Sequence, residues 1–150
     1  MKEFFAMIEK DHDEVKEILE KLNESSSGAV KTREKMFMQL KEEFIPHLKA
    51  EEATLYPALK DQKESRRSAL EGIEEHRLAE MVFKELDGMS KSEELWAIKL
   101  KVFKELVEHH IEEEEDQIFK MAKETLKADK MSQIMESFKK EKEKVKKQIS

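Results

Sequence analysis

Two stretches of the chain share one pattern: residues 47–57 read HLKAEEATLYP and residues 109–119 read HHIEEEEDQIF. In each stretch a histidine precedes a glutamate by four residues, and two apolar or aromatic residues follow four positions later. An α-helix turns about 100° per residue, so residues four apart share a face. The chain has five histidines, and these stretches contain three of them. The pattern predicts two helices that each present an imidazole and a carboxylate on one side.

Helical periodicity extends outward from both stretches. Apolar residues recur every three or four positions over about 4–22, 29–60, 66–86 and 93–126, and polar connections separate these segments. Pro46 lies in the second segment, but the apolar positions keep their phase across it, so we expect a bend there and not the end of a helix. Residues 130–149 form a shorter and weaker amphipathic pattern, which predicts one more helix.

The composition agrees with a helical protein. Charged residues make up 43% of the 150 residues, and the chain has only three glycines and two prolines. We therefore predict an all-α fold: an up-down-up-down four-helix bundle over 1–126, with a C-terminal amphipathic basic helix over 127–150. From Thr125 onward the chain has eight lysines and four acidic residues, although the whole chain has a net charge of −6. That last helix is expected to pack on the bundle or to extend from it.

Several functional classes are disfavoured. The chain has no cysteine, which excludes disulfides, thiolate metal sites and cysteine nucleophiles. Its negative net charge disfavours nucleic acid as a partner. No apolar segment approaches the length of a membrane span, and acidic residues occupy the region where a signal peptide would be apolar, so we expect a cytoplasmic protein with no membrane partner. No serine or threonine nucleophile accompanies the histidines and no glycine-rich phosphate loop is present, so no catalytic residue is assigned.

The helical positions of the polar residues predict one site inside the bundle. Each long segment places a histidine among its apolar positions, and three of them add a glutamate four residues later: His12; His47 and Glu51; His76 and Glu80; His110 and Glu114. His109 lies more than about 90° from the apolar line of its helix, so it should face solvent or the rim. Tyr56 lies near the edge of its apolar line, and either packing or an approach to the site is open to it.

Bound cations explain this inward set best. Buried carboxylates without partners cost several kcal/mol, and three of them close together repel one another. Imidazole nitrogen and carboxylate oxygen suit iron, manganese and zinc, and two shared carboxylates can hold two metal ions. Taken singly, each histidine could instead be a hydrogen-bonded core residue, and each histidine–glutamate pair an ordinary surface pair. Their joint occurrence on four helices favours a metal site.

These motifs resemble the hemerythrin family, in particular the bacterial hemerythrin-like (HHE cation-binding) proteins. The resemblance covers about residues 4–122 and rests on DHDEV at 11–15, FIPHLKAEEATLYP at 44–57, EEHRLAE at 74–80 and HHIEEEEDQIF at 109–119. It implies a four-helix bundle around a non-haem di-iron centre with an oxo or hydroxo bridge. By position, His12 and His47 would bind one iron, His76 and His110 the other, and Glu51 and Glu114 would bridge them. Manganese and zinc rank behind iron.

One departure from the family pattern affects the implied function. Oxygen-carrying hemerythrins have HxxxH on the third helix, whereas Glu80 stands four residues after His76 here. A carboxylate on the metal would favour the ferric state and disfavour reversible oxygen carriage. The last helix of those proteins carries HxxxxD, and here the glutamate can be counted from His110 or, with five residues, from His109.

The resemblance implies a protein that binds or senses dioxygen, a related small oxidant, or iron. One alternative is a di-iron enzyme acting on peroxide or nitric oxide, including a repair protein for iron–sulfur centres, so the sequence leaves open whether the chain is an enzyme. Another is a metal-free helical interaction module whose contact surface begins at Lys130. The oligomeric state is not predicted.

Overall fold

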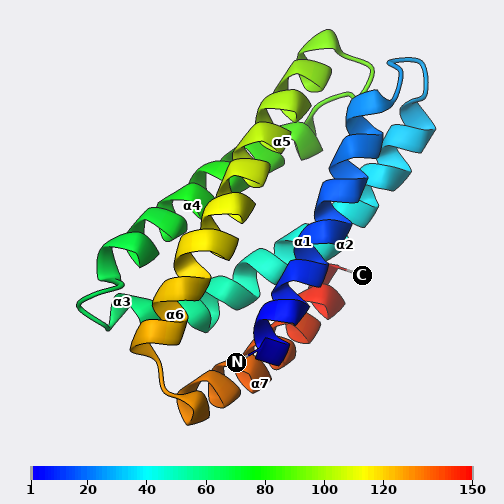
Figure 1. Ribbon diagram of the computed structural model, residues 1–150. Helices are drawn as coiled ribbons and strands as arrows, with labels where there is room; N and C mark the ends of the chain where they lie inside the picture. Colours follow the sequence, from blue (N-terminus) through cyan, green and yellow to red (C-terminus); the bar gives the residue numbers. More distant parts are fainter. Residues whose placement is uncertain (1, 150) are drawn as a thin grey trace.

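The chain is helical almost throughout residues 2–149, the part that the structure describes (Figure 1). In this computed structural model the elements are α1 (Lys2–Glu24), α2 (Val30–Ala53), α3 (Leu55–Lys60), α4 (Arg66–Gly88), α5 (Glu94–Glu113), the π-helix η1 (Glu114–Ile118), α6 (Phe119–Thr125) and α7 (Ala128–Ile149). No strand occurs within the described residues. The predicted all-α class is confirmed. None of the described helices has both the length and the apolar character that a bilayer span requires.

The long helices pack in neighbouring pairs. α1 packs against α2 and α5, and α4 packs against α5 and the short α3 (Figure 1). Arg33 ties the two connections at one end together, because its guanidinium donates to the carbonyl oxygen of Ser25 at 2.8 Å and also to that of Lys91. The side chains buried between the helices form two apolar clusters, one on each side of the polar region that contains the histidines.

The second predicted helix is interrupted after Ala53, seven residues beyond Pro46. α2 continues through Pro46 to Ala53, as the unbroken apolar phase predicts. The helix ends at Thr54, whose φ of −129° and ψ of −66° leave the helical region and whose hydroxyl donates to the carbonyl of Ala50 at 2.6 Å. Pro57 explains the position of the break, because it has no N–H to donate to the carbonyl of Ala53 four residues earlier. The single helix predicted over 29–60 is therefore α2 followed by α3.

The fourth predicted helix contains a π-helical turn. The helix expected over 93–126 is divided into α5, η1 and α6. A π-turn holds one residue more than an α-turn, so the residues after it shift their faces by about one position. Phe119 and Ala122 are consequently buried, whereas Met121, which an unbroken α-helix would place on the same face as Ile118, is only half-buried. The insertion begins at Glu114, one of the predicted site residues.

The C-terminal helix α7 packs along α2 and also contacts α1 (Figure 1). Its buried residues are Met131, Ile134 and Phe138. Phe138 lies edge-on to Phe4 of α1, with ring centroids 5.3 Å apart. The division of the chain into a bundle over 1–126 and a C-terminal helix over 127–150 stays a prediction. Met1 and Ser150 lie outside the described residues.

Candidate metal centre

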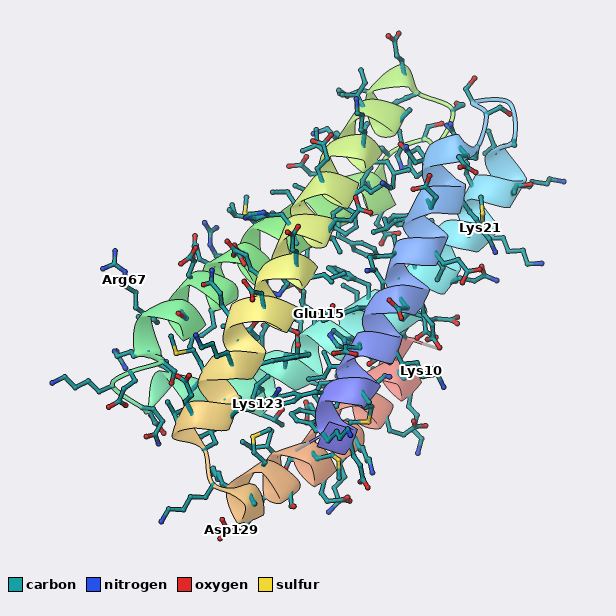
Figure 2. The ribbon with its side chains drawn as sticks, viewed as in Figure 1. Lys10, Lys21, Arg67, Glu115, Lys123 and Asp129 are labelled. Atoms are coloured by element: carbon teal, nitrogen blue, oxygen red, sulfur yellow. The ribbon has the colours of Figure 1, made fainter. Side chains whose placement is uncertain are left out.

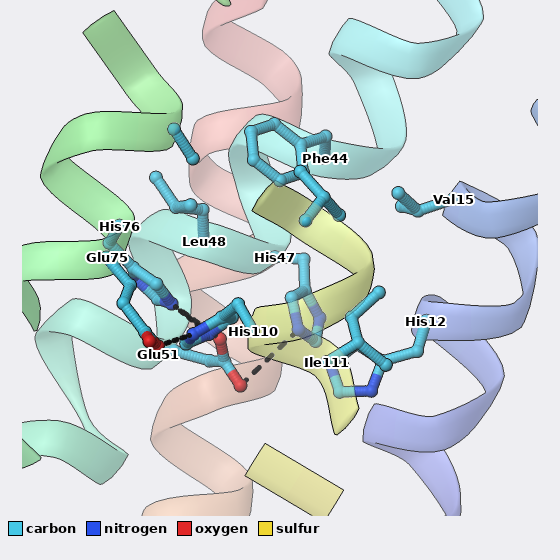
Figure 3. Close-up of a pocket in the computed structure, with 12 residues that line it drawn as sticks. His12, Val15, Phe44, His47, Leu48, Glu51, Glu75, His76, His110 and Ile111 are labelled. Carbon is cyan, nitrogen blue, oxygen red and sulfur yellow. Dashed lines mark hydrogen bonds and ion pairs between the residues drawn. The ribbon is translucent and has the colours of Figure 1, made fainter. Parts of the chain in front are cut away.

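Four histidines from four long helices converge between the two apolar clusters (Figure 3). They form two pairs. The rings of His12 and His47 have centroids 5.0 Å apart, and those of His76 and His110 are 4.6 Å apart. Three of these histidines are buried and His110 is half-buried. In the second pair the two Nε2 atoms lie 3.0 Å apart.

Two carboxylates lie between the histidine pairs, and each turns one oxygen toward each pair. Glu51 places Oε2 3.4 Å from His47 Nε2 and Oε1 3.3 Å from His76 Nε2. Glu114 places Oε1 3.2 Å from His12 Nε2 and Oε2 3.2 Å from His110 Nε2. Both glutamates are almost completely buried. This is the arrangement that two bridging carboxylates require.

The ligand atoms form two groups that share both glutamates. One group is His12, His47, Glu51 and Glu114, and the other is Glu51, His76, His110 and Glu114; within each group the atoms lie within 4.8 Å of one another. Two nitrogen atoms bound at right angles to one metal ion, each at about 2.1 Å, lie about 3 Å apart. The separation of 3.0 Å between the Nε2 atoms of His76 and His110 fits that geometry.

Unsatisfied polar atoms point to the same centre. Three buried side-chain atoms have no hydrogen-bond partner among the described residues: His47 Nε2, Glu51 Oε2 and Glu114 Oε1. All three belong to the first group, around His12 and His47. A buried polar atom without a partner costs about 1–3 kcal/mol, and more when it is charged. A cation in this group would be within reach of all three atoms, so the residues fit a metal ion.

A second set of carboxylates faces the outer nitrogen of each histidine. The Nδ1 atoms of the four histidines lie within hydrogen-bond distance of an acidic oxygen: His12 to Glu115 at 2.7 Å, His47 to Asp11 at 2.8 Å, His76 to Glu52 at 3.2 Å, and His110 to Glu75 at 2.6 Å. Because a carboxylate accepts, Nδ1 carries the proton and the Nε2 lone pair is left for a metal ion. Figure 2 shows Glu115 between η1 and α1.

These outer carboxylates follow a rule that sequence reasoning missed. Each of them is the immediate neighbour of a predicted ligand in the sequence, and each serves a histidine on a different helix. The sequence interpretation did not include them, because it considered the apolar face of one helix at a time. The acidic residues directly beside His12, Glu51, His76 and Glu114 were the signal that could have revealed this second set.

A small apolar cavity adjoins the histidines. It measures about 20 Å³, which is room for a ligand of one or two heavy atoms. Its walls combine polar groups of the centre with six apolar side chains: Val15, Phe44, Leu48, Ala79, Val107 and Ile111 (Figure 3). The apolar wall lowers the local dielectric and keeps bulk water away from one side of the centre.

Comparison with known families supports the geometry. The hemerythrin HHE cation binding domain matches residues 3–122 of the chain. The chain belongs to the hemerythrin family. This confirms the resemblance seen in the sequence, and the buried histidine–glutamate cluster fits the metal cation that such a domain implies. Neither a curated protein nor a solved structure matches the chain significantly. The match to the hemerythrin domain ends before α7 begins at Ala128.

The electrostatics of this hemerythrin centre favour protons wherever a cation is missing. Burial opposes protonation of His47, but the charge of Glu51 and the hydrogen bond to Asp11 outweigh it and raise its pKa to about 10. His110 behaves alike: burial acts against protonation, and Glu114 and Glu75 raise its pKa to about 10. Burial acts to raise the pKa of Glu114, yet hydrogen bonds with Glu51 and the histidines hold it well below its usual value. A metal ion must therefore displace protons in order to bind.

Tyr56 is a further member of the hemerythrin centre. The sequence left open whether it packs or reaches the site, and its hydroxyl donates to Glu114 Oε2 at 2.6 Å in a fully buried position. Burial and the charge of Glu114 raise its pKa well above the ordinary value, so the phenol keeps its proton. Gly72 of α4 makes this position available, because a Cβ atom there would lie 2.4 Å from Cε1 of Tyr56.

The structure brings six of the seven predicted ligands together and places Glu80 elsewhere. Glu80 Oε1 lies 2.9 Å from Lys49 Nζ, so its charge is offset by a lysine. Its contacts therefore do not support the added negative charge on the metal that the sequence interpretation inferred. His109 is exposed, as its helical position predicts, and its Nε2 lies 3.2 Å from Glu113. Metal ligation by the six residues stays a prediction.

Proposed function

We propose that the protein binds two iron ions in a non-haem centre and uses them to bind or sense dioxygen or a related small oxidant. One ion would be held by His12 and His47 and the other by His76 and His110, with an oxo or hydroxo bridge between them. Glu51 and Glu114 would bridge the two ions. The mixed nitrogen and oxygen set suits iron, manganese and zinc, and the hemerythrin family ranks iron first among them; bound iron would supply the redox chemistry.

One observation carries this proposal. Both central carboxylates divide their two oxygens between the histidine pairs, and the three buried atoms without hydrogen-bond partners belong to the same centre. Without a metal ion these three atoms have no hydrogen-bond partner, and only protons on the histidines offset the charge of the two carboxylates. The alternative of a metal-free helical interaction module leaves them unexplained.

The protein residues around the centre have distinct tasks under this proposal. The outer carboxylates hold the protons on Nδ1 and so orient Nε2 inward. Tyr56 donates a hydrogen bond to Glu114 and so fixes the position of that carboxylate. The apolar cavity has room for a ligand of diatomic size, and its apolar wall offers water few hydrogen-bond partners.

The proposal also includes two features predicted from the sequence. The up-down-up-down order of α1, α2, α4 and α5 is supported by the contacts of α1 with α2, of α4 with α5, and of α1 with α5. The cytoplasmic location is kept as the sequence predicts it.

Iron loading tests the proposed function. Metal-free protein is given ferrous iron without oxygen, its bound iron is counted by elemental analysis, and its absorption is recorded before and after air is admitted. We expect two irons per chain and a new near-ultraviolet and visible absorption after oxidation. Glu51→Ala should lose both the iron and the absorption. Glu112→Ala, a change at an exposed position in the acidic run 112–116, should lose neither. No retained iron in the unmodified protein would reject the proposal.

A further inference from the structure

The helix α7 lies outside the residues that match the hemerythrin domain, yet it reaches the candidate metal centre. We propose that α7 is a working part of that centre, in which Lys142 positions the ligand His47 through Asp11. The inference rests on the proposed function, since it concerns one of the two metal positions.

A chain of two short contacts connects α7 to the centre. Lys142 Nζ lies 2.7 Å from Asp11 Oδ1, and Asp11 Oδ2 lies 2.8 Å from His47 Nδ1. Asp11 thus uses one oxygen for each neighbour. With both oxygens engaged, the carboxylate has little freedom to rotate, and the ring of His47 is held in one orientation.

Asp11 differs from the other three outer carboxylates in its burial. Its side chain is 6% exposed, whereas Glu115, Glu52 and Glu75 are 31%, 30% and 23% exposed. Water screens the partly exposed carboxylates, but a buried carboxylate needs a cationic partner to remain charged at low cost. Lys142 is the cationic partner of Asp11 from outside the centre, so this ion pair exists only while α7 is docked.

A second residue of α7 encloses the same histidine. Phe138 is fully buried, and its ring lies edge-on to the ring of His47 with centroids 5.6 Å apart. Phe138 and Lys142 are four residues apart and so share one face of α7. In Figure 3 the faint ribbon of α7 runs behind that of α2, the helix that carries His47. This face of the helix therefore both closes the outer side of His47 and supplies the charge for Asp11.

The two metal positions become unequal as a result. The contacts described above for His76 and His110 come from α2, α3, α4, α5 and η1. His47, by contrast, has a direct contact and a relayed contact with α7. Loss of the Lys142 charge should weaken binding at the position of His12 and His47 and leave the other position unaffected.

Cobalt titration of the full chain tests this inequality. Metal-free protein is titrated with Co²⁺ alone, its visible d–d bands are recorded for each equivalent, and affinities are obtained by competition with a chelator. In Lys142→Met we expect about a tenfold or larger loss of affinity for one of the two equivalents, with the other unchanged. Lys142→Arg, which keeps the charge, should restore most of that loss. Lys140→Met removes a charge from an exposed position of the same helix and should match the unmodified protein.

The possible results separate the two proposals. If the unmodified chain binds two equivalents and Lys142→Met binds them equally well, or loses both equally, the role of α7 is rejected and the proposed function stands. An equal loss in Lys140→Met also rejects it. If the unmodified chain binds no cobalt, the proposed function fails and this inference fails with it. If Lys142→Met does not fold, the double variant Asp11→Asn/Lys142→Met, which removes both charges of this ion pair, must show the same loss at one equivalent for the inference to hold.

Discussion

At the scale of single residues, Lys49 offers a direct comparison between two glutamates. Its ammonium lies 2.9 Å from Glu80 and 3.7 Å from Glu52, but only Glu52 also faces a histidine of the centre, His76. Glu52→Gln should weaken metal binding about ten- to hundredfold, because the replaced group orients a ligand. Glu80→Gln should leave affinity and stoichiometry unchanged.

The measurement for this pair is the metal content per chain together with the dissociation constant from chelator competition. Both variants remove one charge next to the same lysine, so a general electrostatic effect would change both alike. A loss of one equivalent in Glu80→Gln would restore Glu80 as a ligand, as the sequence first suggested.

The inward residues could be predicted from the sequence because helical geometry alone decides them. His47 and Glu51 share a helix face whatever the rest of the fold does, and the same holds for His110 and Glu114. The roles of Asp11 and Glu52 depend on which helix lies beside them, and periodicity within one segment does not contain that information. Glu80 was misplaced for the same reason, since Lys49 lies on a different helix.

At the scale of helices, the close contact between α3 and α4 depends on Gly72, which has no side chain. A Cβ atom at Gly72 would lie 2.4 Å from the ring of Tyr56, which is itself fixed by its hydrogen bond to Glu114. Gly72→Ala should therefore lower the free energy of unfolding by about 1–3 kcal/mol, as overpacking of a filled site does. Urea denaturation followed by circular dichroism measures this.

Gly88 supplies the matched control for that substitution. It is also in α4, but a Cβ atom there would meet nothing within 4 Å. Gly88→Ala should leave stability unchanged or slightly raised, because alanine restricts the unfolded chain. Equal effects at the two glycines would show that the close approach of Tyr56 is not what Gly72 allows.

Apolar spacing predicted the long helices but not the breaks within them. The number and approximate extent of the long helices followed from apolar spacing, and so did the continuation of α2 through Pro46. The break at Thr54 was not predicted, because the apolar spacing continues past it to Leu55 and gives no sign of the effect of Pro57. The π-turn at Glu114 has no compositional mark in a run of four glutamates, and it displaced the expected burial of Met121 to Ala122.

At the scale of the whole molecule, the outer carboxylates close a ring around the centre. α1 supplies Asp11 to His47 of α2, and α2 supplies Glu52 to His76 of α4. α4 supplies Glu75 to His110 of α5, and η1 supplies Glu115 to His12 of α1. Each helix thus supports a ligand of the next one, which couples the metal positions to the packing of all the long helices.

This coupling makes the stability of the metal-free protein depend on pH. The pKa values of His47 and His110 are raised to about 10 in the folded state, against about 6.5 when unfolded. A raised pKa stabilises the fold fully below the unfolded value, and this contribution is lost as pH rises toward the folded value. We expect the free energy of unfolding of the metal-free protein to fall between about pH 7 and 10.

Urea titrations of the metal-free protein at several pH values measure this dependence. With metal bound, the histidines are deprotonated at any of these pH values, so the fall should become smaller and the melting temperature should rise. Metal-free stability that rises over the same interval would contradict the described proton network.

The position of Trp96 has a practical consequence. It is the only tryptophan of the chain, it is fully buried, and its indole donates to the carbonyl of Leu86 at 3.1 Å. It belongs to the apolar cluster that contains Phe37 and Phe83, whereas the buried residues of α7 belong to the other cluster. Intrinsic fluorescence excited at the indole therefore reports the state of one end of the molecule only. Detachment of α7 should leave this emission unchanged, whereas unfolding of the four long helices should shift it. A change in the emission therefore indicates denaturation and not undocking.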